Sequence, residues 1–381
     1  MWRAGLLDPR AIAVPLAESL PGVQLIPGLV DTVDLAGHRL QVSNPEGGSR
    51  TVGWDRLVLT PGLVTRLVDV PGVREHARGL KTLAEALYLR DHLLGQLELA
   101  AAEPAGPGRD ARRTVVVVGA SYAGTELVVQ LRALADEAAR RQLIAASDIR
   151  FLLLDAAGHV MPEVGPRLGQ RALGVLRERG VDVRLGTTLT RVAEDHVVLS
   201  DGSAVGTRTV AWVTGVTASP LIGRLGLGLD RGRLVVNADL GVPGHLDVFA
   251  GGDAAAVPDL TKPGTVTPPT AQHATRQGHA LARNVAASLG VGRGRPYRHR
   301  DLGLVVDLGP GHAVADPLGL HLAGFPAKVV TRAYHLYALP RAANRLAVAL
   351  GYLTDAAPPR PLVNLGLVPP DAASFAGAEP G

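Results

Sequence analysis

The stretch Thr114–Glu126 reads Thr-Val-Val-Val-Val-Gly-Ala-Ser-Tyr-Ala-Gly-Thr-Glu, a run of β-branched residues that breaks into a turn containing glycine. The four valines suit a strand that is buried on both faces of a parallel sheet. Gly119 permits a tight turn, and Gly124 permits close packing of a following helix. The N-terminus of such a helix offers N–H groups and a positive dipole end to a pyrophosphate. The stretch therefore predicts a dinucleotide-binding strand–turn–helix unit.

This turn departs from the pattern Gly-x-Gly-x-x-Gly at one position, where Ser121 replaces the second glycine. Serine is small, so the backbone can still approach a phosphate. The alternative interpretation is an ordinary strand-to-helix turn without a ligand.

Asp155 follows the next predicted strand. An acid at this place in a dinucleotide fold accepts hydrogen bonds from the adenosine ribose, and its negative charge favours NADH over NADPH. The alternative there is a carboxylate that only begins a turn.

The composition excludes several classes of protein. A chain of 381 residues is long enough for about two domains, and 46% hydrophobic residues exclude a disordered chain. The sequence contains no cysteine, which excludes disulfides, iron–sulfur ligation and redox dithiols. Electron transfer would therefore need an organic cofactor. We also expect no metal site. A net charge of +4 and 3% aromatic residues argue against nucleic acid as a partner. With no signal peptide or membrane-spanning run in the sequence, we expect a cytoplasmic protein.

Local patterns predict the remaining elements. The predicted strands are 23–26, 28–34, 39–42, 56–60, 114–118, 149–154, 181–185, 189–193, 196–199 and 209–214. The predicted helices are 81–102, 122–138, 166–179 and 270–289, with a linker at 103–113 and a hairpin within 303–314. Because strands and helices alternate in the centre of the chain, we expect a parallel sheet there, with an antiparallel flap.

A second organised site follows this central part. Leu246–Asp253 is a short strand that runs into a glycine pair and a carboxylate, and a proline-rich segment then starts the helix 270–289. The alternative for Asp253 is a turn cap. Further on, residues 317–354 contain no Asp or Glu, and apolar side chains alternate with Lys328, Arg332, Arg341 and Arg345. This basic amphipathic region predicts either a peripheral membrane-docking element or a packing and homodimer surface.

These motifs together resemble one family. Thr114–Glu126, Asp155, Thr214–Val216, Val248–Asp253 and Pro269–Ala274 follow one another as in flavoproteins with two dinucleotide-binding domains. Within this pyridine nucleotide-disulfide oxidoreductase-like group, the chain resembles a type II NADH dehydrogenase, which lacks the redox cysteines. The resemblance implies an α/β fold with two Rossmann-like three-layer (ββα) domains and a C-terminal helical extension. It also implies FAD and NADH as cofactors and a quinone or similar small electron acceptor as partner.

The resemblance also implies a domain organisation. The FAD domain would comprise residues 1–85 and 215–316, the NADH domain 110–214, and the membrane-docking or dimer region 317–381. Met1 stands beyond the place where such flavoproteins carry the glycine turn for the ADP half of FAD, so we expect the FAD domain to lack its first βαβ unit. The location would then be the inner face of the cell membrane. The alternatives are a flavin-poor, non-catalytic nucleotide-binding relative and a soluble NAD(P)H reductase with another acceptor.

The candidate site residues belong to both predicted domains. Glu126, near nicotinamide and flavin, and Gln272, at the pyrimidine end of the flavin, would be the catalytic residues. Reduced flavin accumulates negative charge there, which the N–H groups of a helix start stabilise. The candidate cofactor-binding residues are Thr60, Gly62, Gly119, Ser121, Tyr122, Gly124, Glu126, Asp155, Gly215, Gly252, Asp253, Ala271 and Gln272.

Overall fold

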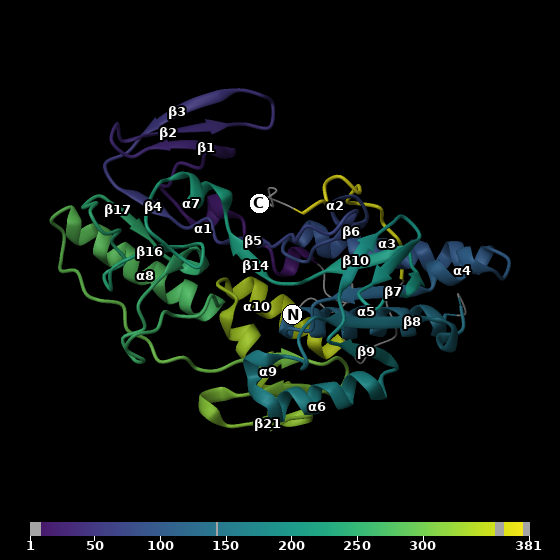
Figure 1. Ribbon diagram of the computed structural model, residues 1–381. Coiled ribbons are helices and arrows are strands. Elements are labelled where there is room, and N and C mark those ends of the chain that lie inside the picture. Colours follow the sequence, from purple (N-terminus) through teal and green to yellow (C-terminus); the bar gives the residue numbers. More distant parts are fainter. Residues whose placement is uncertain (1–8, 142–143, 355–361, 376–381) are drawn as a thin grey trace. The chain divides into compact units, whose positions relative to one another are not determined.

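The computed structural model describes residues 9–141, 144–354 and 362–375, and the chain divides into two compact units (Figure 1). Unit 1 comprises residues 1–19, 65–215 and 302–376, and unit 2 comprises residues 20–64, 216–301 and 377–381. The division at 215 coincides with the predicted end of the NADH domain. Residues 65–85 and 302–316, which we assigned to the FAD domain, belong to unit 1, and which cofactor each unit binds stays a prediction.

Unit 1 is built on a five-stranded parallel sheet with the strand order β6-β13-β7-β8-β9. Its strands are β6 (Ala77–Arg78), β7 (Thr114–Val118), β8 (Arg150–Asp155), β9 (Val181–Leu185) and β13 (Thr209–Trp212). Every residue of β7 is buried, as expected for the central strand of a sheet that is covered on both faces. The predicted α/β class with a parallel sheet is confirmed.

Three long helices pack with this sheet into one continuous apolar core. They are α3 (Leu83–Ala102), α5 (Tyr122–Arg140) and α6 (Gly165–Glu178). The start of α3 is set by a capping box, in which Glu85 N donates to Thr82 Oγ1 at 3.2 Å and Thr82 N donates to Glu85 Oε2 at 2.6 Å. Short helices α2 (Val73–His76) and α4 (Pro107–Arg112) complete this part of the unit.

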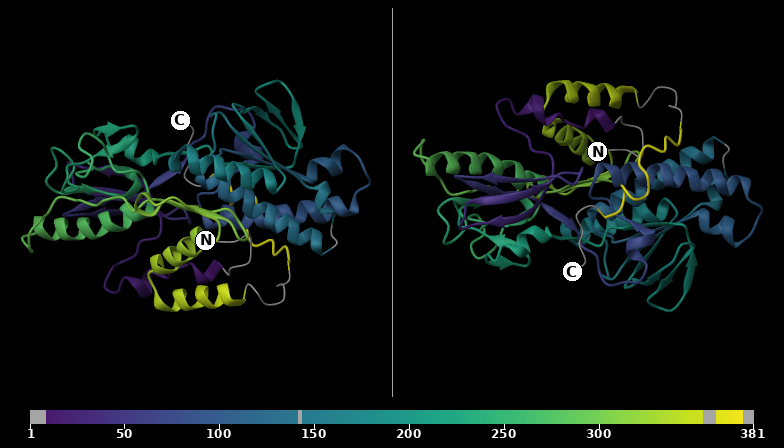
Figure 2. Two further views of the ribbon diagram at one scale, coloured as in Figure 1. Left: turned by 90° about the horizontal axis from the view of Figure 1, so that it is seen from below. Right: turned by 90° about the horizontal axis from the view of Figure 1, so that it is seen from above.

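Smaller elements of unit 1 lie outside the parallel sheet. The predicted antiparallel flap consists of β10 (Leu189–Val192), β11 (His196–Leu199) and β12 (Ala204–Gly206). The predicted hairpin is β19 (Val305–Asp307) and β20 (Ala313–Ala315), extended by β21 (Leu322–Ala323). The helices α9 (Phe325–Ala338) and α10 (Ala342–Thr354) follow, and α10 lies beside the first described turn, since Asn344 Nδ2 donates to the Ala11 carbonyl at 2.8 Å (Figure 2). Helix α1 (Leu16–Ser19) belongs to the same unit.

Unit 2 combines small sheets with one long helix, α8 (Ala271–Ser288). Its antiparallel sheet is β1 (Leu29–Asp34), β2 (Arg39–Ser43) and β3 (Ser49–Gly53). The parallel pair β4 (Leu57–Leu59) and β17 (Val248–Ala250) lies in the core with Leu281 of α8. The other elements are β5 (Leu63–Thr65), β14 (Val216–Ala218), α7 (Pro220–Arg224), β15 (Leu229–Asp230), β16 (Arg233–Val235) and β18 (Ala255–Ala256).

Two local predictions are wrong. Residues 23–26 form no strand: Val23 is 56% exposed and Leu25 41% exposed, so apolar residues that alternate here have no partner strand to pair with. The linker at 103–113 contains α4, which Pro107 starts at a position where proline costs no hydrogen bond. Ala111 is buried, and Arg112 Nε binds Glu103 Oε1 at 2.8 Å, so tertiary contacts hold this helix in place.

We predict opposite effects for one substitution at two helical glycines. A Cβ at Gly124 of α5 would collide with the Gly119 carbonyl oxygen, so Gly124→Ala should destabilise the chain by about 2 kcal/mol. Gly174 of α6 has open space around its Cβ position, so Gly174→Ala should stabilise the chain by about 0.5–1 kcal/mol. Urea denaturation measures both, and a Gly124→Ala chain as stable as Gly174→Ala would contradict the tight packing.

Candidate cofactor sites

The glycine turn of unit 1 is fixed by the strand on each side of it. Gly119 N donates to the Leu154 carbonyl of β8 at 2.7 Å, and φ at Gly119 is 109°, a conformation that favours glycine. The Val213 carbonyl, just after β13, lies so close to Gly119 that a Cβ could not fit. The segment that leads to Gly215 therefore lies beside the turn, as a site at the carboxyl ends of parallel strands requires.

Asp155 ends β8 and binds the same turn. Its Oδ2 accepts from Ala120 N at 2.5 Å, and its Oδ1 accepts from Ala157 N at 2.7 Å. Asp155 therefore stabilises a turn, as the alternative interpretation of this carboxylate predicted. A carboxylate oxygen can accept more than one hydrogen bond, so these two bonds leave acceptor capacity for ribose hydroxyls. Ribose binding by Asp155 stays a prediction.

Helix α5 begins at Ser121, whose side chain makes no cap hydrogen bond. The serine that replaces the second glycine thus leaves its helix start without a side-chain cap. A second acid lies close to this turn, Glu163, which the sequence analysis missed. Desolvation raises the pKa of Glu163, and the Asp155 carboxylate adds to the rise, while hydrogen bonding from the Tyr122 backbone opposes it. The Glu163 carboxyl therefore lies near Asp155 and the start of α5.

Glu126, on the same helix, belongs to a separate buried group of charges. Its Oε1 accepts from Asp307 N of β19 at 2.7 Å. Lys328 of α9 pairs with Asp307 Oδ1 and donates to the Gly309 carbonyl at 2.8 Å. Desolvation raises the pKa of Glu126, the Asp307 carboxylate raises it further, and the Lys328 ammonium opposes both. Two carboxyl groups and one ammonium therefore share this interior site.

The burial of Lys328 corrects one prediction. We expected it on a basic surface, but its residue is 4% exposed and its ammonium is paired inside the unit. Burial also lowers the pKa of His335, about two turns further along the same face of α9, to about 4. The amphipathic pattern alone could not distinguish a cation that pairs with Asp307 from one that faces water.

In unit 2 the second candidate site lies at the carboxyl ends of β4 and β17. Gly251 N donates to the Leu59 carbonyl at 3.3 Å, which places Thr60 near the Gly251–Asp253 turn. Gly252 N donates to Gln277 Oε1 of α8 at 2.7 Å. Arg233 of β16 supports the same loop, because its Nε donates to the Asp253 carbonyl at 3.0 Å and its Nη1 to the Thr267 carbonyl at 3.0 Å.

Two polar side-chain atoms at this site lack a hydrogen-bond partner among the described residues. Asp253 Oδ1 and Thr270 Oγ1 are buried and have no hydrogen-bond partner within the part of the chain that the structure describes. Thr270 is the N-cap residue of α8, and its side chain makes no cap hydrogen bond. Buried polar groups are almost always paired in proteins, so these atoms point to a ligand group. The residues of unit 2 therefore fit the flavin that the resemblance implies.

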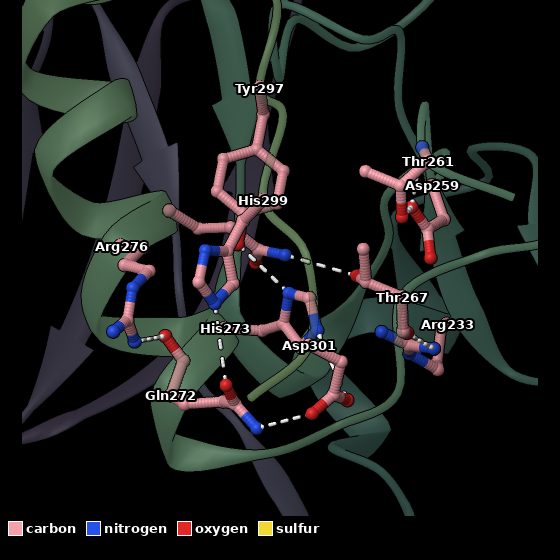
Figure 3. Close-up of polar contacts among 11 residues, drawn as sticks. Arg233, Asp259, Thr261, Thr267, Gln272, His273, Arg276, Tyr297, His299 and Asp301 are labelled. Atoms are coloured by element: carbon pink, nitrogen blue, oxygen red, sulfur yellow. Dashed lines mark hydrogen bonds and ion pairs between the residues drawn. The ribbon is translucent and has the colours of Figure 1, made fainter. Parts of the chain in front are cut away.

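Gln272 lies in the first turn of α8 within a polar cluster (Figure 3). Its Nε2 donates to Asp301 Oδ1 at 2.7 Å, and its Oε1 lies 3.3 Å from His299 Nε2. The neighbouring His273 is 1% exposed, and its Nδ1 lies 2.8 Å from the Tyr297 hydroxyl.

The structure thus gathers the candidate residues into three groups. The turn of unit 1 brings together Gly119, Ser121, Tyr122, Gly124, Asp155 and Gly215. Glu126 lies apart from them with Asp307 and Lys328, and unit 2 carries Thr60, Gly62, Gly252, Asp253, Ala271 and Gln272. Sequence reasoning missed Glu163, Arg233, Gln277, His299 and Asp301.

We predict that Lys328→Met destabilises the chain by about 3–5 kcal/mol, because it leaves the buried Asp307 without its cation. The double variant Lys328→Met/Asp307→Asn should recover most of this loss. The matched control is Arg332→Met on the same helix, which removes a stacking contact of 4.7 Å with Tyr352 and should cost about 1 kcal/mol. Equal stability of Lys328→Met and Arg332→Met in urea denaturation would refute the buried pair.

Comparisons with known proteins identify the family of the chain. A family model described as pyridine nucleotide-disulphide oxidoreductase matches residues 12–278. The chain is 31% identical over 350 residues to demethylphylloquinone reductase NdbB of Synechocystis sp., covering 90% of this chain and 81% of that protein. It is 31% identical over 349 residues to type II NADH:quinone oxidoreductase Ndh of Mycobacterium tuberculosis, covering 87% and 74%.

A solved structure shares the fold. The structure of NDH2 from Plasmodium falciparum in complex with NADH matches 94% of this chain and 90% of its own, with a TM-score of 0.84 and 14% sequence identity. This likeness confirms the fold class. The family model and the two relatives at 31% identity confirm the resemblance as well, and they show that the chain belongs to the pyridine nucleotide-disulphide oxidoreductase family, among the flavoproteins related to type II NADH dehydrogenases.

Proposed function

We propose that this chain is a FAD-dependent oxidoreductase that takes a hydride from NADH and passes electrons to a quinone. One observation carries the proposal. Asp253 Oδ1 and Thr270 Oγ1, two buried side-chain atoms of unit 2, have no hydrogen-bond partner among the described residues. Buried polar groups are almost always paired in proteins, so these atoms fit hydrogen bonds to a bound cofactor. Relatives named as NADH:quinone and demethylphylloquinone reductases support the same activity.

Unit 1 would bind NADH at the start of α5. The Gly119 turn allows the backbone to approach the pyrophosphate, and Asp155 would bind the adenosine ribose. The Asp155 carboxylate would oppose an additional phosphate on that ribose. Glu126 would lie near the nicotinamide, and its raised pKa lets the carboxyl hold a proton closer to neutral pH.

Unit 2 would bind FAD between the Gly252–Asp253 turn and the start of α8. When bound, FAD accepts the hydride and releases electrons one or two at a time to the quinone. Asp253 Oδ1 would accept a hydrogen bond from the cofactor, and Gln277 and Arg233 hold the loop that presents it. The N–H groups at Ala271 and Gln272 supply fixed donors where negative charge develops, without reorganisation.

The helices α9 and α10 would dock on a membrane surface, where a quinone dissolves. Large apolar side chains on them are exposed: Phe325 by 73%, Tyr337 by 76%, Leu346 by 62% and Leu350 by 51%. The cations between them are engaged within the unit: Arg341 Nη2 binds Glu18 at 2.8 Å, and Arg345 Nε donates to the Leu339 carbonyl at 2.7 Å. No described helix is long and apolar enough to cross a bilayer. We favour peripheral docking over a homodimer surface.

We predict that the full chain, purified and supplied with FAD, shows flavin absorbance that NADH bleaches without oxygen and that a soluble quinone restores. A chain that takes up no FAD would overturn the proposed function and favour the non-catalytic alternative. Bleaching by NADH without recovery on addition of quinone would favour a reductase with another acceptor.

The same assay tests Asp155. Asp155→Asn keeps one of the two acceptor oxygens that bind the turn and loses the charge, so the preference for NADH over NADPH should fall by roughly tenfold, or 1.4 kcal/mol. Glu163→Gln is the matched control for loss of a nearby carboxylate, and we expect a smaller change. Unchanged selectivity in Asp155→Asn would show that Asp155 is only a turn residue.

We predict that the full chain floats with anionic lipid vesicles in a density gradient. The quadruple variant Phe325→Ser/Tyr337→Ser/Leu346→Ser/Leu350→Ser should remain at the bottom, because about 1.5–3 kcal/mol of burial energy is lost at each large apolar position. Leu229→Ser, at an exposed leucine of unit 2, is the control. Flotation that the four substitutions do not change would refute membrane docking, and a shift from dimer to monomer in the variant would assign the surface to a second copy.

A further inference from the structure

The start of α8 is bound by a segment that follows the helix in the sequence. Tyr297, His299 and Asp301 alternate along an extended stretch, so their side chains share one side of it. All three face the first turn of α8 (Figure 3). Tyr297 contacts His273, while His299 and Asp301 contact opposite ends of the Gln272 side chain. One short segment therefore fixes two successive residues of α8.

The chemistry of the partners sets the direction of each hydrogen bond. A carboxylate only accepts, so the Gln272 amide nitrogen must face Asp301, and its oxygen must then accept from His299 Nε2–H. Burial raises the pKa of Tyr297 to about 12, which keeps the phenol protonated as a donor to His273 Nδ1. His273 Nε2 lies 3.6 Å from Asp301 Oδ2. The polar contacts of the cluster thus converge on one carboxylate.

The charges around this carboxylate are few. Burial lowers the pKa of His273 and of His299, so both rings are neutral at pH 7. Arg276 Nη1 donates to the Gln272 carbonyl at 2.9 Å, on the other side of the first turn. Asp259 faces the histidines as well, but its Oδ1 accepts from Thr261 N at 2.8 Å and closes its own turn. Asp301 is therefore the carboxylate in direct contact with the start of α8.

We propose that Asp301 and His299 are positioning residues that hold Gln272 at the flavin-facing start of α8, and that the Asp301 carboxylate lowers the reduction potential of the flavin. The inference rests on the proposed function, since it assumes that α8 begins beside the flavin. Reduction adds negative charge to the flavin, which the positive end of α8 stabilises. A carboxylate bound to the same helix turn opposes that stabilisation. The two effects together set how readily the flavin accepts the hydride.

The test measures the midpoint potential of the FAD-loaded full chain by spectrophotometric titration against reference dyes. Asp301→Asn keeps an acceptor oxygen for Gln272 and removes the charge, so its midpoint should move to a more positive potential. Asp301→Glu keeps the charge and should stay close to the unmodified chain. Asp259→Asn is the matched control and should shift the midpoint less. A midpoint unchanged in Asp301→Asn, or shifted more in Asp259→Asn, overturns the proposal.

His299 is tested through FAD affinity. His299→Ala removes the donor to Gln272 Oε1, and we expect the dissociation constant of FAD to rise about fivefold, which corresponds to about one neutral hydrogen bond. His299→Gln supplies a new N–H donor and should restore most of the affinity. Equal affinity in all three chains would show that His299 does not position Gln272.

A flavin-free measurement separates this proposal from the proposed function. In the full chain without FAD, hydrogen exchange of the Gln272 side-chain amide is followed by nitrogen-15 NMR, with Gln272→Glu to assign the signal. Exchange should be slower than at the exposed Gln24 and should accelerate at least fivefold in Asp301→Ala. Equal rates at Gln272 and Gln24 would overturn the positioning role, whatever the chain does with FAD.

Discussion

The contact between Gly124 and the Gly119 carbonyl is the constraint on which the carboxyl edge of the parallel sheet in unit 1 depends. Only a hydrogen atom fits between this helix and the preceding turn. Because α5 starts so close to β7, the turn can reach Leu154 and Asp155 of β8. A larger residue at position 124 would push the start of α5 away from the strand ends that form the site. The glycine therefore determines where a negatively charged ligand can bind, although it offers no side chain to the ligand.

The sequence predicted the features that residues close together in the chain determine. The valine run of β7 and the boundaries of β9 and β11 were all predictable, since hydrophobic periodicity and turn residues act within a few positions. The two helix starts of the candidate sites were predictable for the same reason. The start of α5 directly follows β7 and the Gly119 turn, and the start of α8 follows a proline-rich segment.

Long-range pairing explains what the sequence did not reveal. Lys328 looks like a surface cation on an amphipathic helix, and only the position of Asp307, 21 residues away, makes it an interior one. Glu163 approaches the α5 turn through the fold, not through a motif. Residues 23–26 show the converse, because an alternating pattern forms a strand only when another strand pairs with it. Charge partners and strand partners are properties of the folded chain.

Cofactor binding at the starts of α5 and α8 would link the stability of the folded chain to cofactor supply. A capping side chain typically stabilises a helix by about 1 kcal/mol, and neither Ser121 nor Thr270 provides that bond. Any anionic ligand that fills both places stabilises only the folded chain, so the folded fraction rises with ligand concentration. A cell short of riboflavin would then hold less of this protein as well as less of its cofactor. The amount of this protein in the cell would then fall with riboflavin supply, because the chain without FAD would be degraded, and no regulatory protein would be required.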